Sequence, residues 1–160
     1  MWNRRKQNTW KGLAAGLTAG LVASFTMDQF QAAINKRKRK EQGDDATAKV
    51  AGRISEGVFR HQLTNNQKRW AAPAVHYIYG ALVGGLYGAL AERRTPVRAL
   101  AGVPYGAAVW LLGDEVAMPL LQLSKGPRKY PIANHARALA SHVVYGATTD
   151  LVRRVVRRAL

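Results

Sequence analysis

Four apolar segments alternate with polar, mostly basic segments along the chain, and their lengths predict helices that cross a membrane. The clearest covers residues 71–90, a stretch without a single Lys, Arg, Asp or Glu. A helix of that length rises about 30 Å, the thickness of a hydrocarbon core. The other three segments are shorter between charges. The predicted spans are residues 10–34, 71–91, 98–122 and 135–153.

This pattern predicts an all-α fold, a polytopic membrane protein with about four glycine-rich transmembrane helices and a basic amphipathic loop, residues 35–69. The whole chain is expected to form one helical membrane domain. The alternative is a soluble α-helical protein in which residues 71–90 form a fully buried helix.

Glycines recur at every fourth position in three of these segments, which places them on one face of each predicted helix. In a membrane, small residues at this spacing let another helix approach closely. In a soluble core helix they are costly, since each interior glycine costs about 1 kcal/mol relative to alanine. The glycines predicted to form helix-packing faces are Gly12, Gly16, Gly20, Gly80, Gly84, Gly88, Gly102 and Gly106.

Basic residues are concentrated between the first two spans and at the end of the chain. Within the loop, residues 46–61 are predicted to form an amphipathic helix on the membrane surface, because Val50, Ile54 and Val58 make one apolar stripe. A solvated linker helix is the alternative. The residues expected to hold anionic lipid headgroups are Lys36, Arg37, Lys38, Arg39, Lys40, Arg153, Arg154, Arg157 and Arg158.

The composition of the chain says more about its binding partners than about its fold. The net charge of +16, from 25 basic and 9 acidic residues, favours nucleic acid or an anionic membrane surface. Nucleic acid is the less favoured partner, because no aromatic residues interleave with the terminal arginines as base-stacking platforms. The chain has no cysteine and contains no nucleotide-binding loop, H-E-x-x-H or G-x-S-x-G motif. We therefore predict neither enzymatic activity nor a cofactor.

Five titratable residues fall at similar depth within the predicted spans. The acids lie near the C-terminal ends of the first and third spans, and the histidines near the N-terminal ends of the second and fourth. Charged groups inside a bilayer are costly unless they are paired. An Asp–His cluster can relay protons or hold a divalent metal, whereas the alternative is pairing with one another, with helix ends or with headgroups. The residues are Asp28, His76, Asp114, Glu115 and His142.

The order of these motifs repeats in the two halves of the chain. The spacing G-x3-G-x7-D occurs at Gly16 and again at Gly102, and H-x-x-Y-G occurs at His76 and again at His142. Two helical hairpins related by duplication would produce this order. Chance is the alternative in a chain with 15 glycines.

Several loose motifs lie in the second half of the chain. They are the glycine-rich helix after His76 that ends in Ala-Glu, the AMPLLQL segment at 117–123, the A-S-H triplet at 140–142 and the closing D-L-V-R-R at 150–154. Over residues 71–158 the chain resembles the YagU-like family of bacterial inner-membrane proteins. The resemblance implies a multi-pass helical protein whose biochemical activity is not established, and it implies no catalytic residue. The basic block at residues 36–40 departs from the pattern expected of that family.

These observations favour a small, non-enzymatic, multi-pass protein of the bacterial inner (plasma) membrane. It would pack through glycine-lined helices, hold anionic lipid through its basic loop and tail, and meet a second copy or another membrane protein. One alternative is proton- or metal-linked transport, or metal binding, by the Asp/His cluster. Another is a soluble basic helical protein that binds nucleic acid. The basic block beside the first span favours a cytoplasmic location for the 35–69 loop.

Overall fold

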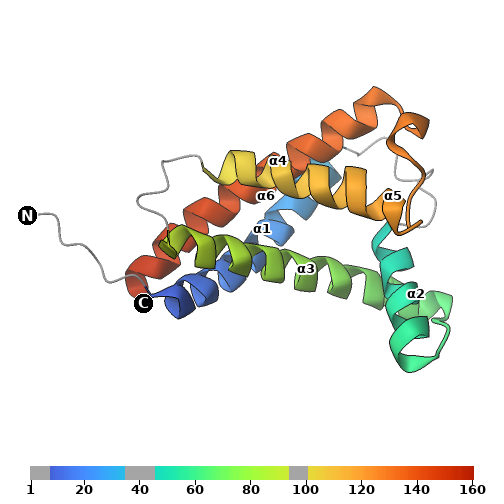
Figure 1. The fold of residues 1–160 in the computed structure, drawn as a ribbon, viewed down its shortest axis with the longest axis horizontal. Helices are drawn as coiled ribbons and strands as arrows, with labels where there is room; N and C mark the ends of the chain where they lie inside the picture. The colour runs from blue at the N-terminus through green and yellow to red at the C-terminus, as the bar shows by residue number, and fades with distance from the viewer. Residues whose placement is uncertain (1–7, 35–45, 94–100) are drawn as a thin grey trace, which may run out of the picture.

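The chain folds into a bundle of helices (Figure 1). This computed structural model describes residues 8–34, 46–93 and 101–160, and within these ranges it contains no strand. The predicted all-α fold is therefore confirmed. In chain order the elements are α1 (Thr9–Ile34), α2 (Ala46–Phe59), α3 (Asn65–Arg93), α4 (Gly102–Trp110), the π-helix η1 (Leu111–Ala117), α5 (Met118–Leu120), the 3-10 helix η2 (Pro127–Lys129) and α6 (Ile132–Ala159).

The helices form four rods that alternate in direction along the chain. α1, α3 and α6 are one rod each. α4, η1 and α5 together make the third rod, because they follow one another with helical backbone angles. α1 packs against both α3 and α6, and α4 packs against α6. The shorter α2 packs against α3 at one end of the bundle, which we call the α2 end. The connection 121–131 lies at the same end, and the C-terminus lies at the opposite, C-terminal end (Figure 1).

A capping box starts α3 earlier than the predicted span. The hydroxyl of Thr64 accepts a hydrogen bond from the backbone N–H of Gln67 at 3.3 Å, and the backbone N–H of Thr64 donates to the Gln67 side chain at 2.8 Å. α3 therefore begins at Asn65, six residues before the predicted start at position 71. α2 ends two residues earlier than predicted, where Arg60 takes a left-handed φ of 51°.

Small side chains, together with Met27, Tyr87 and Tyr145, fill the core, and many large aliphatic side chains face outward. On α1, Ala15, Ala19 and Ala23 are fully buried, whereas Phe25 is 55% exposed. On α3, Leu82 is 62% exposed. A water-soluble bundle shows the opposite arrangement, because burial of large apolar side chains drives its folding. The other exposed large apolar residues of the four rods include Leu21, Val22, Ile78, Leu86, Leu90, Leu111, Leu112, Leu120, Leu151 and Val155.

The close approach of α1 and α3 depends on glycine. A Cβ atom on Gly84 would lie 2.5 Å from the carbonyl oxygen of Gly16 and 2.6 Å from the Cα of Gly20, so no side chain fits there. Space is equally short along the rest of the crossing, where the nearest atoms are mostly backbone, although the side chain of Ser24 lies closest to Gly80 and that of Glu92 closest to Gly12. The facing pairs are Gly12 and Gly88, Gly16 and Gly84, and Gly20 and Gly80.

α4 and α6 meet in the same way. A Cβ atom on Gly146 would lie 2.7 Å from the backbone nitrogen of Gly106, and one on Gly102 would overlap the carbonyl oxygen of Gly146. Gly106 itself lies against the backbone of His142. Gly146 is thus a packing glycine that the four-residue spacing did not reveal, because it is the single glycine of its helix.

Among the described residues, one helix is long and apolar enough to cross a membrane by length and composition alone. It is Asn65–Glu92, with a mean hydropathy of 1.3 in its most apolar stretch. Only 28% of that stretch is buried, which is unlike the core helix of a soluble protein. The four-span topology remains a prediction.

Candidate functional site

Three histidine–carboxylate pairs lie toward the α2 end of the bundle. The first joins α1 to α3, where the His76 Nε2 atom lies 3.2 Å from one oxygen of Asp28. The hydroxyl of Tyr77 donates a hydrogen bond of 2.9 Å to the other oxygen of the same carboxylate. Asp28 is therefore engaged by two consecutive residues of α3, and Tyr77 joins this group although no role was predicted for it from the sequence.

The π-helix η1 provides the acids of the other two pairs. Asp114 lies 3.8 Å from the Nε2 atom of His142, and Glu115 lies 2.5 Å from the Nδ1 atom of His135. Both histidines belong to α6. The wider turn of a π-helix is often found at functional sites, and here it carries two consecutive acids that each reach a histidine of the same neighbouring helix.

Each α6 histidine also meets a backbone carbonyl oxygen. His142 Nδ1 lies 2.9 Å from the oxygen of Ala138, and His135 Nε2 lies 3.0 Å from the oxygen of Pro127. Each ring therefore faces a carboxylate at one nitrogen and a carbonyl at the other. Both contacts of His135 are within hydrogen-bond distance, whereas the 3.8 Å between His142 and Asp114 is longer than a hydrogen bond.

The five predicted cluster residues thus divide between two places. His76 pairs with Asp28 in the α1–α3 hairpin, and His142 pairs with Asp114 between η1 and α6. Glu115 takes His135, a histidine at the start of the fourth predicted span that had no assigned role. Within residues 8–34, 46–93 and 101–160, no group of three or more potential ligands is arranged to hold a metal ion.

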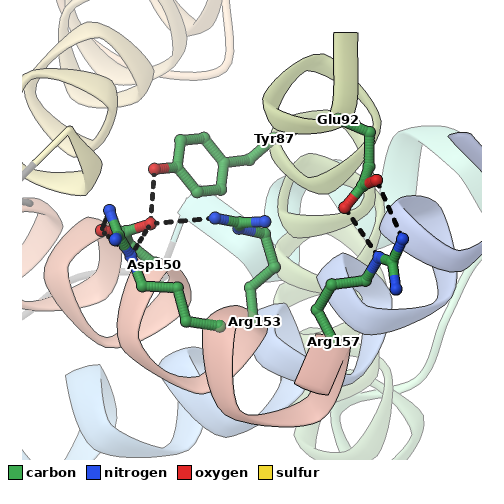
Figure 2. A network of polar contacts seen from close by, with 6 residues as sticks. Tyr87, Glu92, Asp150, Arg153 and Arg157 are labelled. Atoms are coloured by element: carbon green, nitrogen blue, oxygen red, sulfur yellow. Dashed lines mark hydrogen bonds and ion pairs between the residues drawn. The ribbon is translucent and has the colours of Figure 1, made fainter. Parts of the chain in front are cut away.

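A second polar network lies toward the C-terminal end (Figure 2). The Asp150 carboxylate of α6 accepts a hydrogen bond from the hydroxyl of Tyr87 on α3 at 2.9 Å, and the Nε atom of Arg154 lies 3.0 Å from both of its oxygens. These hydrogen bonds raise the pKa of the Arg154 guanidinium. The guanidinium of Arg153 lies 3.5 Å from Asp150 and 5.7 Å from the centre of the Tyr87 ring.

The ends of three helices meet in the same region. Arg157 of α6 donates to both carboxylate oxygens of Glu92 on α3, at 2.8 and 3.2 Å. Glu92 also accepts a hydrogen bond from the backbone N–H of Asn8, just before α1. Figure 2 shows the Glu92–Arg157 pair beside the Asp150 group, so that one side of α6 is joined to α3 by an ion pair and by the hydrogen bond from Tyr87 to Asp150.

The prediction that the terminal arginines face lipid headgroups requires correction for part of the set. The side chain of Arg153 is 9% exposed and lies inside the bundle, and both Arg154 and Arg157 bind carboxylates. The physical reason is that Asp150 lies three residues before Arg153 and four residues before Arg154, and a helix brings side chains at these spacings together. Arg158 remains exposed. The other predicted headgroup residues, at positions 36–40, lie outside the described residues.

Two tyrosines bind backbone carbonyl oxygens of α3 in the middle of the bundle. The hydroxyl of Tyr145 on α6 donates to Gly80 at 2.6 Å, and that of Tyr105 on α4 donates to Val83 at 2.7 Å. Each hydroxyl is satisfied without water, as a polar group in a dry interior requires. These contacts connect α3 to α4 and α6, which belong to the second half of the chain.

The fold and its two networks define a class of protein, an all-helical bundle with glycine-lined interfaces and ionic contacts toward both ends. The chain belongs to the family described as protein of unknown function (DUF1440), whose model matches residues 47–151. The match runs from α2 into α6 and thus includes both acids of η1 and most of the partners described above. No curated protein and no solved structure gives a significant match.

Proposed function

We propose that the chain is a non-enzymatic, multi-pass protein of the bacterial inner membrane whose four helical rods cross the bilayer and whose basic surfaces hold anionic lipid. The observation that carries the proposal is the arrangement of side chains by size. Alanine and glycine line the helix interfaces, whereas leucine, isoleucine, valine and phenylalanine face outward. Lipid can cover such a surface, while water would leave a large apolar area exposed.

The spacing of the charged groups supports the same proposal. On α3, His76 and Glu92 are separated by sixteen residues, or about 24 Å of helix, close to the thickness of a hydrocarbon core. Between them, Ile78, Leu82 and Leu86 are between 54% and 62% exposed. Polar networks at two levels with an apolar surface between them are the pattern expected of a membrane bundle.

One substitution distinguishes a membrane location from a soluble bundle. In the bilayer, Leu82→Arg places a charge near the middle of α3 and costs about 3 kcal/mol of insertion free energy. On the surface of a soluble protein the same change is nearly neutral. The matched control is Asn66→Arg, which adds the same charge at an exposed position in the first turn of α3, outside the apolar stretch.

The measurement is retention in the membrane pellet after a carbonate wash. We expect the unmodified chain and Asn66→Arg to remain in the pellet and Leu82→Arg to be strongly reduced there. Recovery of the unmodified chain in the supernatant, with Leu82→Arg folded and soluble, would contradict the proposal. It would favour the soluble basic protein that binds nucleic acid.

The three histidine–carboxylate pairs support a second candidate, proton-linked transport. They lie in two different helix contacts at one end of the bundle, where protonation changes the charge of groups that hold rods together. The test is proton flux in vesicles that contain the purified chain, compared with a variant that carries His76→Gln and His142→Gln. Flux that is absent, or equal in the two proteins, rejects this candidate and leaves the first in place.

A further inference from the structure

A cavity of about 390 Å³ lies at the α2 end of the bundle, outside both polar networks. Three segments surround it: one face of α2, the connection into α3 with the first turn of that helix, and the residues that follow α5. Its polar lining consists of Lys49, Arg53, Glu56, Gln62, Lys68 and Gln122.

The charge of this cavity is unbalanced. Lys49 and Arg53 come from α2 and Lys68 from α3, whereas Glu56 is the single acid in the lining. None of the three cations forms an ion pair within the described residues. Arg153, Arg154 and Arg157, by contrast, all lie against carboxylates. Basic side chains that converge without a protein partner attract an anion.

The shape of the cavity leaves room for a ligand. Gly52 lies between Lys49 and Arg53 on the lining face of α2, and a Cβ atom placed there would meet nothing within 4 Å. Leu123 is 7% exposed and provides an apolar wall. Gln122, which follows the third rod with a left-handed φ of 58°, also lines the cavity. Gln62 and Gln122 add two residues with amide donors to the lining that contains the three cations.

We propose that this cavity binds a phosphate group, presented by an anionic lipid headgroup or by a small soluble phosphate ester. Three cationic donors and two amide donors match the oxygens of a phosphate, which accept several charge-assisted hydrogen bonds. The lipid source rests on the proposed membrane location, because the cavity lies beside the start of α3, at the level expected for headgroups. The soluble source does not depend on that location.

The experiment uses the full chain in neutral-detergent micelles and follows its thermal unfolding as a probe is added. The probes are phosphatidylglycerol, phosphatidylcholine and glycerol phosphate. A ligand that binds the folded state raises the unfolding temperature with its concentration, and the dependence gives the affinity. The site variant is Lys49→Gln with Arg53→Gln, and the control is Arg128→Gln with Lys129→Gln, two exposed basic residues of η2 outside the cavity.

We expect phosphatidylglycerol or glycerol phosphate to stabilise the chain, and the site variant to bind at least about tenfold more weakly while the control keeps its affinity. Stabilisation by phosphatidylglycerol alone identifies the lipid source, and stabilisation by glycerol phosphate identifies the soluble source. Lys68→Gln provides a second site variant if the double variant unfolds without ligand. Equal weakening in the site and control variants, or no stabilisation by either anionic probe, overturns the proposal. The carbonate wash is independent of this result.

Discussion

The two hairpins of the bundle, α1 with α3 and the α4–η1–α5 rod with α6, use the same devices in different arrangements. In the first, bare glycine backbones meet and Asp28 pairs with His76. In the second, glycine backbones meet again and Asp114 pairs with His142. The acids and histidines that correspond in the sequence repeat also correspond in their contacts, as duplication of a hairpin would predict.

The hairpins differ in register and in the shape of one helix. Gly20 faces Gly80 in the first hairpin, but its counterpart Gly106 faces the backbone of His142, one helical turn from the counterpart of Gly80. The second hairpin also contains η1, which brings an extra acid, Glu115, to α6. The difference teaches that the sequence motifs determine which groups meet, while the helix geometry between them determines how many pairs form.

The largest expected effect comes from filling the glycine contacts. Gly84→Leu in the first hairpin and Gly146→Leu in the second would each place a side chain where backbone atoms of the neighbouring helix lie. Each is expected to lower the free energy of unfolding by more than about 3 kcal/mol. Leu82→Ala, on the exposed face of α3, is expected to change stability by about 0.5 kcal/mol. Thermal unfolding in detergent measures all three. If only one of the two glycine variants is destabilised, the glycine contacts of the two hairpins are not equivalent.

The packing faces were accessible from sequence because their physical cause is local. A four-residue spacing places glycines on one helix face whatever the partner is, so Gly16 and Gly84 could be assigned to a contact. Which glycine faces which, and the role of the isolated Gly146, depend on how two helices cross. The helix starts were less accessible, although the Thr64–Gln67 capping box was present in the sequence and extends α3 beyond its apolar stretch.

A smaller effect is expected from removal of a buried carboxylate. Asp150→Ala leaves the buried guanidinium of Arg153 and the hydroxyl of Tyr87 without their partner, at a cost of about 2 to 3 kcal/mol. The comparison is Asp28→Ala in the first hairpin, where the carboxylate is 39% exposed and the cost is expected to be about 1 kcal/mol. Denaturant unfolding of both variants measures the difference. Equal costs would contradict the distinction between a buried and a half-exposed network.

The polar contacts show why side-chain partners were harder to predict than helices. The depth of these residues along the predicted spans was enough to place Asp28 near His76 and Asp114 near His142. It was not enough to find His135, because depth alone does not determine toward which residue of α6 the side chain of Glu115 points. The burial of Arg153 was missed for a similar reason, since paired arginines at a helix end look alike whether they face lipid or a carboxylate.

The smallest expected effect is the difference in coupling between the two corresponding pairs. A double-mutant cycle with Asp28→Ala and His76→Ala is expected to give about 1 kcal/mol of coupling, because these groups lie 3.2 Å apart. The cycle with Asp114→Ala and His142→Ala is expected to give slightly less, because the separation of 3.8 Å weakens the electrostatic attraction. Strict additivity in both cycles would show that neither pair contributes to stability.

The size arrangement of the side chains also governs how this sequence can change over evolution. Every amino-acid replacement of a glycine adds atoms, so at Gly16 or Gly84 each missense mutation enlarges a position that has no free volume. At Leu82 or Leu86, exchange among leucine, isoleucine, valine and phenylalanine keeps the outward surface apolar and disturbs no contact. We therefore expect divergence to be slowest at the packing glycines, so that descendants of one ancestor would keep a spaced pattern of glycines after most of their larger apolar residues have been replaced.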